Sequence, residues 1–139
     1  MTSKREQILA YVATQLGGVT GVGGRVYRSR QAAIRKEESP SIIIEPINDQ
    51  AVQTVVGALT WSLQFRVAVV ARGDIPDQIA DPVVSELYGL LMDDRNMGGS
   101  ALDLLPRGTY FSMMDGDQSI GIIETVFEVT YRTQETTLT

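Results

Sequence analysis

Residues 59–72 read Leu-Thr-Trp-Ser-Leu-Gln-Phe-Arg-Val-Ala-Val-Val-Ala-Arg and carry the clearest structural pattern in the chain. Apolar and polar side chains alternate along this stretch, which is the signature of a strand with one face on a core. A strand this long, about twice the usual length, rarely lies at a sheet edge, because a large unpaired ladder invites aggregation. We therefore predict an interior strand. One side carries Trp61, Leu63, Phe65, Val67, Val69 and Ala71, and the other carries Thr60, Ser62, Gln64, Arg66 and Arg72.

The end of the chain predicts a C-terminal β-hairpin, preceded by a glycine-containing loop at 96–108. Residues 109–114 and 120–133 flank an Asp-Gly-Asp turn signal at 115–117. The second strand continues the alternation, so its charged residues share a face with those of the long strand. The inner set is Ile123, Thr125, Phe127, Val129 and Tyr131, and the charged set is Glu124, Glu128 and Arg132.

Upstream of the long strand the pattern is weaker. Residues 42–44, all isoleucine, predict a short strand bounded by Pro40 and Pro46, because proline cannot continue a central ladder. The Asn-Asp-Gln triplet at 48–50 is typical of a turn or a loop tip. Gly57 then predicts a bend that leads into the long strand.

The first helix is predicted from about residue 4 to residue 16. Ser3 can cap it, Glu6 supplies the other half of a capping box, and apolar residues recur at helical spacing. The glycine-rich residues 17–24 follow a helix rather than a strand, and they lack the Lys-Ser or Lys-Thr of a phosphate-binding loop. We interpret them as a turn. The apolar set of the helix is Ile8, Leu9, Val12 and Leu16.

The second helix is predicted to open at Asp77, or at Asp81 with Pro82 as its first residue, and to end at the pair Asp93 and Asp94. This carboxylate pair has no third ligand near it in the sequence, so we expect a solvated helix end rather than a metal site. The apolar stripe comprises Ile79, Val83, Leu87, Leu90 and Leu91.

These elements predict an α+β fold: a single mixed or antiparallel sheet, two helices packed on one face, long loops and the C-terminal hairpin. The 139 residues, 43% of them hydrophobic, suit one domain covering residues 1–139. The polar face of the sheet then meets water or a neighbouring subunit.

The chain has no cysteine and no histidine, which removes thiol chemistry, the usual zinc sites and the commonest general base near neutral pH. We therefore expect no enzyme activity, no catalytic residues, no metal and no cofactor. The N-terminus lacks the hydrophobic stretch of a signal peptide, and no apolar run is long enough for a membrane span. The expected location is the cytoplasm, with no membrane partner.

The net charge of −5 conceals an uneven distribution. Residues 1–36 carry seven Lys and Arg against one Glu, a net charge of +6, so the remainder carries −11. The basic residues 25–40 read as an exposed strand followed by an arm. Such a patch suits either nucleic acid, with Tyr27 stacking on a base, or a protein contact. The acidic remainder would repel phosphate, so we favour the protein contact.

Motifs from most of the chain, taken in order, form a pattern that resembles one protein family. They are Arg-Val-Tyr-Arg-Ser-Arg (25–30), Glu-Glu-Ser-Pro-Ser-Ile-Ile-Ile-Glu-Pro (37–46), Ala-Arg-Gly-Asp (71–74), Ile-Ala-Asp-Pro-Val-Val (79–84), Leu-Met-Asp-Asp-Arg (91–95), Gly-Gly-Ser-Ala-Leu-Asp-Leu (98–104) and Phe-Glu-Val-Thr-Tyr-Arg-Thr (127–133). This order resembles the tail terminator proteins of long-tailed bacteriophages, of the minor tail protein U type.

The resemblance implies a small subunit that assembles into a hexameric ring, caps the growing tail tube, stops its polymerisation and presents a head-tail joining surface. The implied partners are copies of itself, the tail tube protein and a head-neck connector protein, while DNA passes through the channel without sequence-specific binding. The implied location is the virion tail, after assembly in the host cytoplasm. The alternatives are a neck or head-completion connector protein, or a nucleic-acid-binding module that uses residues 25–36.

The resemblance assigns no individual contacts, so the candidate interface residues follow from charge and expected exposure alone. They are Arg25, Arg28, Arg30, Arg35, Lys36, Glu37, Glu38, Arg66, Glu124, Glu128 and Arg132.

Overall fold

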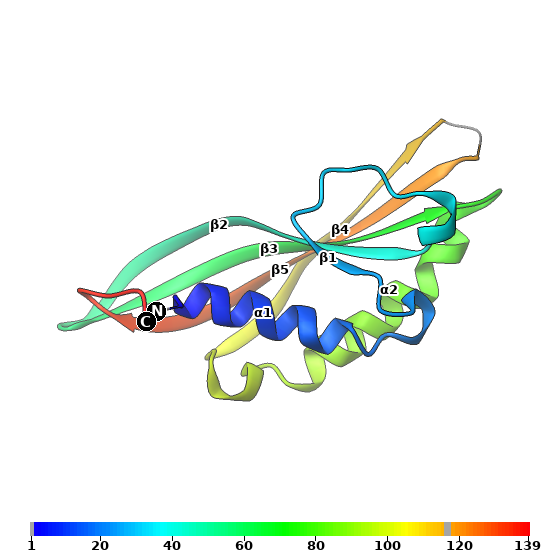
Figure 1. Cartoon of the computed structure of the whole chain (residues 1–139). Coiled ribbons are helices and arrows are strands. Elements are labelled where there is room, and N and C mark those ends of the chain that lie inside the picture. Colours follow the sequence, from blue (N-terminus) through cyan, green and yellow to red (C-terminus); the bar gives the residue numbers. More distant parts are fainter. Residues whose placement is uncertain (1, 116–117) are drawn as a thin grey trace.

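The computed structural model describes residues 2–115 and 118–139, with the backbone alone for 53–55, so the turn predicted at 115–117 lies partly outside the described residues. Two helices pack under one long, twisted sheet, and the two chain ends lie close together (Figure 1). The elements are α1 (Lys4–Leu16), the 3-10 helix η1 (Thr20–Val22), β1 (Val26–Arg28), η2 (Lys36–Glu38), β2 (Ser41–Val55), β3 (Ala58–Arg72), α2 (Pro76–Asp93), η3 (Met97–Gly99), β4 (Asp103–Met114) and β5 (Ile120–Gln134).

The sheet has the strand order β1-β2-β3-β5-β4, with β1 parallel to β2 and all other neighbours antiparallel. The α+β prediction is therefore confirmed, and the sheet is mixed. The long strand predicted at 59–72 is β3, and it lies in the centre, paired along its length with β2 and β5. The predicted hairpin is confirmed as the antiparallel pair β4 and β5.

The face of the sheet that carries the helices, here the helix face, holds the main core. The alternation of β3 places Leu63, Phe65 and Val67 there, fully buried with apolar residues of α1 and α2. Phe65 stacks on Phe127 of β5 with ring centroids 5.6 Å apart. The period-two pattern thus determined which side of β3 is buried, as predicted.

Trp61 lies on the same side of β3 as Phe65 but has other partners. It stacks instead on Tyr131, 6.3 Å between centroids, and its Nε1 donates a hydrogen bond of 2.8 Å to Thr133 Oγ1. Four residues of strand separate Trp61 from Phe65 by roughly 13 Å, which is more than one side chain can span.

The short strand predicted at 42–44 is wrong in extent, because β2 continues through Pro46 to Val55. Strand β1 pairs only with residues 42–44, so β2 is an edge strand from residue 45 onward, where proline is tolerated. A register shift between Pro46 and Asn48 accommodates the ring. The triplet at 48–50 consequently lies in the strand, and the turn is at Gly57, whose φ is +88°.

The boundaries of α1 are confirmed, and Ser3 Oγ accepts a hydrogen bond of 3.1 Å from the Glu6 backbone N–H. The start predicted for the second helix is wrong: α2 begins at Pro76, whose fixed φ suits the first helical position, and it includes Pro82. The buried stripe also differs from the predicted one, since Ala80 is buried while Ile79 is exposed.

The first strand of the hairpin also begins earlier than predicted, at Asp103 rather than at residue 109. A register shift between Pro106 and Gly108 lets the strand pass its proline. None of the helices in the described residues combines the length and apolar character needed to span a bilayer.

Candidate subunit and partner interface

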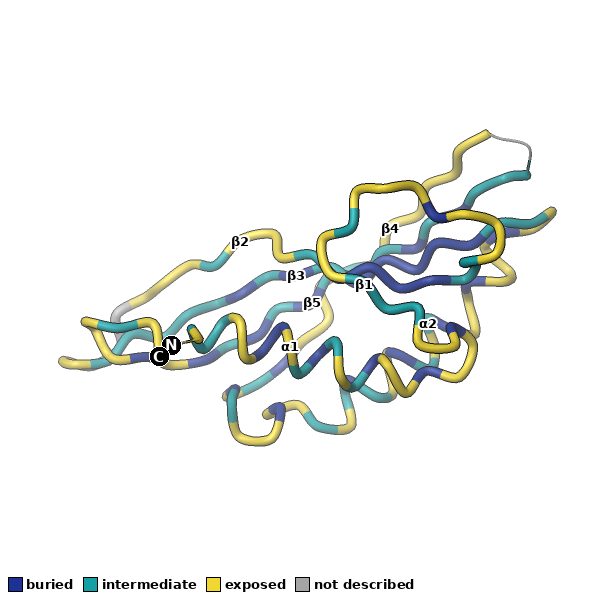
Figure 2. Tube along the Cα trace, viewed as in Figure 1, coloured by how far each residue is buried: buried dark blue, intermediate teal, exposed yellow. Residues whose placement is uncertain are grey.

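Residues 29–40, here the arm, cover one end of the second face of the sheet, the face opposite the helices (Figure 2). Ile34 is buried there against Ile43, Ala68 and Val70. Arg72 Nε donates a hydrogen bond of 2.8 Å to the Ile34 carbonyl and ties the arm to β3. The expectation of an exposed arm and a wholly polar second face is therefore wrong at this end. The signal was present in the sequence, since residues 67–71 are apolar at five consecutive positions, as in strands buried on both faces.

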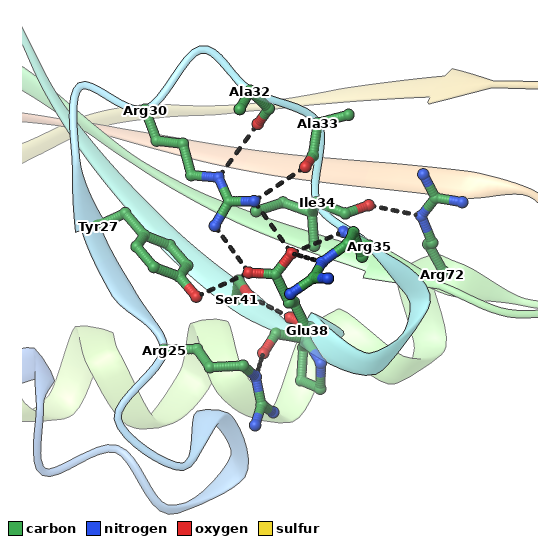
Figure 3. A network of polar contacts seen from close by, with 11 residues as sticks. Arg25, Tyr27, Arg30, Ala32, Ala33, Ile34, Arg35, Glu38, Ser41 and Arg72 are labelled. Atoms are coloured by element: carbon green, nitrogen blue, oxygen red, sulfur yellow. Dashed lines mark hydrogen bonds and ion pairs between the residues drawn. The ribbon is translucent and has the colours of Figure 1, made fainter.

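Glu38 is the centre of the polar network that shapes the arm (Figure 3). Its carboxylate accepts hydrogen bonds from Arg30 Nη1 at 2.8 Å, Arg30 Nη2 at 3.0 Å and the Tyr27 hydroxyl at 3.1 Å. The backbone N–H and Nε of Arg35 donate two more, each 3.1 Å. These donors, the Arg30 guanidinium foremost, hold the pKa of Glu38 well below its ordinary value. The Arg30 guanidinium also lies 4.5 Å from the centre of the Tyr27 ring.

Two other candidate arginines bind groups of their own chain. Arg28 makes a bidentate ion pair with Glu6 of α1, at 2.9 and 3.0 Å, and this lowers the pKa of Glu6. Arg25 Nε donates a hydrogen bond of 3.0 Å to the Pro40 carbonyl. Much of the basic patch therefore makes contacts within its own subunit. Of the candidate residues in the arm, Arg35, Lys36 and Glu37 are exposed.

The four candidate residues on β3 and β5 lie together on the second face, as the alternation predicts. Arg66 and Glu124 form an ion pair of 3.6 Å, and Arg132 Nε donates a hydrogen bond of 3.4 Å to Thr60. Glu128 accepts an ion-paired hydrogen bond of 2.8 Å from Arg107 of β4.

The polar contacts continue across the sheet: Gln64 Nε2 donates to Glu128 at 3.5 Å, and Asn48 Nδ2 donates to Gln64 at 3.4 Å. One polar row thus crosses four strands, from Asn48 on β2 to Arg107 on β4. Arg107 was not among the predicted residues, because its place in the β4 register shift is not visible in the sequence.

A further surface that the sequence did not indicate is the outer strand β4. It pairs with β5 on one side only, so its other edge is open in the described chain. Its large apolar side chains are exposed over the same stretch, namely Tyr110, Phe111, Met113 and Met114. A long, apolar, unpaired edge is an aggregation hazard unless another chain covers it.

These surfaces have the composition of surfaces that bind other proteins. Among the described residues no group of three or more Asp or Glu side chains is placed to hold a metal ion. The arrangement offers ion pairs, apolar side chains and open strand edges, which are the components of protein-protein contacts.

Neither a protein-family model nor a curated protein matches the sequence. The structure, however, is similar to a chain from the virion of a native gene transfer agent particle, with a TM-score of 0.71 over 90% of this chain and 94% of that chain. The two chains share a fold. Their sequence identity is 13%, so the comparison shows common architecture and assigns no residue a role.

Proposed function

We propose that this protein is a structural component of a phage-like virion, and that it forms the ring that caps the tail tube. The observation that carries the proposal is the shared fold with a virion chain, because it extends over nearly the full length of both chains. The order of motifs along the sequence, which resembles the tail terminators, supports the finer assignment.

A ring of identical subunits needs a contact in which one surface of each copy meets a different surface of the next. The chain offers such unequal surfaces: an exposed basic turn on the arm and an exposed apolar strand at the other edge of the sheet. We propose six subunits, to match the symmetry of a tube end, with DNA passing through the channel without sequence-specific binding.

In this proposal the ring has two protein partners, the tail tube protein on one side and a head-neck connector protein on the other. The protein performs no catalysis, and it binds no cofactor. It is made in the host cytoplasm and remains in the virion tail.

Tube length tests the proposal. The tube protein of the same phage is polymerised with increasing amounts of this protein, and tube lengths are measured by electron microscopy. A cap that stops elongation shortens the tubes in proportion to its concentration and is seen at one tube end. Unchanged lengths and bare ends would contradict the capping role. Binding to head portals in place of tube ends would favour the neck-connector alternative.

The nucleic-acid alternative is weaker, because the arginines at 25, 28 and 30 bind groups of their own chain. A phosphate-binding patch needs cations that remain available to the backbone of the nucleic acid.

A further inference from the structure

A groove lies on the helix face between α2 and the outer strand β4. One part, a hollow of about 530 Å³, is lined by Asp81, Tyr88 and Thr125 among others. The adjoining part, about 380 Å³, is lined by Asp77, Phe111 and again Asp81. The two parts adjoin at Asp81, which lines both, and together they are here called the α2–β4 groove.

The groove is incomplete in the single chain. Phe111 is 71% exposed and Ile75, beside it, is 56% exposed, although both are large apolar side chains. Thr125 is only 4% exposed, yet its Oγ1 has no hydrogen-bond partner among the described residues. Buried hydroxyls are normally hydrogen-bonded, and contiguous large apolar side chains are normally covered by other protein atoms. A polypeptide that covers the groove would remove Phe111 and Ile75 from solvent.

The charge of the groove indicates what kind of polypeptide fits. Its lining includes the carboxylates of Asp77 and Asp81, both exposed and at the start of α2, and it includes no Lys or Arg. The complementary segment must therefore carry positive charge and small or apolar side chains.

The outer turn of the arm has this chemistry. It exposes Ala32 and Ala33, followed by two adjacent cations, Arg35 and Lys36, and by one carboxylate, Glu37, so the exposed side chains of residues 35–37 carry a net charge of +1. The Arg35 side chain is 75% exposed, although its Nε bonds to Glu38. The carbonyl of Ile34, the residue before Arg35, accepts a hydrogen bond from Arg72 of β3, so the exposed turn is fixed to the sheet (Figure 3).

The arm cannot fill the groove of its own chain. It packs on Ile43, Ala68 and Val70 of the second face, whereas the groove has Ile123 and Thr125 of the helix face as its floor. The sheet separates the two surfaces. Any contact between them joins different copies. A contact between two unlike surfaces propagates from copy to copy, and it closes into a ring when the rotation between neighbours divides a full turn.

We propose that the α2–β4 groove receives the outer turn of the arm of a second copy of this chain, with Asp77 and Asp81 facing Arg35 and Lys36. This inference rests on the proposed function, since it supplies the contact between neighbours in the ring.

The test is an exchange of charge. The groove-reversed variant carries Asp77→Lys and Asp81→Lys, and the arm-reversed variant carries Arg35→Glu and Lys36→Glu. The control, Asp93→Lys, makes the same kind of change at the far, exposed end of α2. Melting temperatures verify folding, and assembly is followed by solution mass across concentration and by capping of tubes.

Each reversed variant should fail to assemble alone, because like charges then face each other in every contact. An equimolar mixture should assemble, since each arm then meets a groove of opposite charge and the two variants alternate around a ring with an even number of subunits. The variant with all four substitutions should also assemble, and the control should behave as the unmodified protein.

Phe111→Ala provides a second, charge-independent variant, because an exposed side chain is dispensable for folding. It should raise the concentration of half-assembly about tenfold or more, as loss of an aromatic interface anchor does.

Three results would overturn the inference. Reversed variants that assemble normally would place the contact elsewhere and leave the ring itself intact. Variants that fail alone and are not restored by mixing or exchange would show that the groove binds something other than the arm. An unmodified protein that neither self-associates nor caps tubes would overturn the ring and the capping function together.

Discussion

Arg30 Nη1 lies 2.8 Å from Glu38 Oε2, so these two residues, which the sequence analysis assigned to a subunit or partner interface, form an ion pair within the arm of one chain. Both side chains are mostly shielded from solvent, and the same carboxylate gathers Tyr27 and Arg35. The arm is therefore held in shape by its own charges, and Arg35 belongs both to this network and to the exposed surface.

Replacing Glu38 by Gln should lower the melting temperature at neutral pH, because the Arg30 guanidinium loses its anionic partner. The difference from the unmodified protein should depend on pH in a defined sense. The pKa of Glu38 is lowered in the folded state from its ordinary value of 4.5. Its contribution is thus fully present above pH 4.5 and is lost as the pH falls below that value.

Thermal melting of both proteins between pH 7 and the lowest pH at which they fold measures this dependence. The gap in melting temperature should stay constant above pH 4.5 and shrink below it. A gap that widens in acid would contradict the assigned role of the carboxylate.

Truncating Phe65 to Ala should cost about 3 to 5 kcal/mol of unfolding free energy, since the ring is fully buried and stacks on Phe127. Arg66→Ala, one residue along the strand, should cost no more than about 1 kcal/mol, because its ion pair with Glu124 is partly exposed. Gln64→Ala should be similarly mild. Denaturant unfolding of the three variants compares the two faces of β3 directly. Equal costs for Phe65→Ala and Arg66→Ala would mean that the second face is buried within the subunit.

Tyr131→Phe should destabilise the protein by about 1.5 to 3 kcal/mol, the range for a hydrogen bond to a charged group. The Tyr131 hydroxyl donates to the side chain of Asp49, which is largely buried and otherwise contacts Arg5 Nη1 at 3.3 Å. Burial and this bond raise the pKa of Tyr131, so the hydroxyl stays protonated at neutral pH.

Tyr11→Phe is the matched control for this pair. The Tyr11 hydroxyl also donates to a carboxylate, that of Asp94, which lies at the more exposed end of α2 and accepts a second bond from the Gly98 N–H. Its loss should cost clearly less. Equal losses would show that burial of the acceptor does not matter here.

Gly121→Ala should cost about 1 to 3 kcal/mol, because a Cβ at this position of β5 would lie 2.8 Å from Cβ of Pro76 and 2.9 Å from its Cγ. The proline ring at the start of α2 is rigid, so it cannot move away from the added methyl group without shifting the backbone. The control is Gly89→Ala on the same helix, where the added methyl meets open space. That change should leave the protein equally stable or raise its stability by up to about 1 kcal/mol. The unfolding free energy should therefore fall for Gly121→Ala and should not fall for Gly89→Ala.

The central part of the fold was predictable because burial imposes a local period. The alternation of β3 and β5 placed Phe65 and Phe127 on the helix face, and the cap at Ser3 fixed the start of α1. The boundaries that failed all involve proline. Whether Pro46 ends a strand depends on which strand lies at the edge, and strand order is a property of the whole sheet.

The candidate interface was less predictable from the sequence. A charged residue is expected to pair with an opposite charge, but the sequence does not show whether that charge lies in the same chain or in a neighbour. Arg30 and Glu38 are eight residues apart and were both assigned to a neighbour, while the structure pairs them in one chain. The exposure of Arg35 agrees with the expectation. The groove at Phe111 could not be predicted from the sequence. It exists because α2 covers β3 and β5 and stops short of β4, and no local sequence pattern shows how far a helix extends across a sheet.

Whether the protein forms a ring is decided by its mass in solution, followed across concentration and again in the presence of assembled tubes. We expect a ring of six times the 15.2 kDa chain mass, formed by the protein alone at high concentration or at the tube end, since a template can stabilise a weak ring. A protein that remains at the mass of one chain at every concentration, and that also fails to bind tube ends, would contradict it.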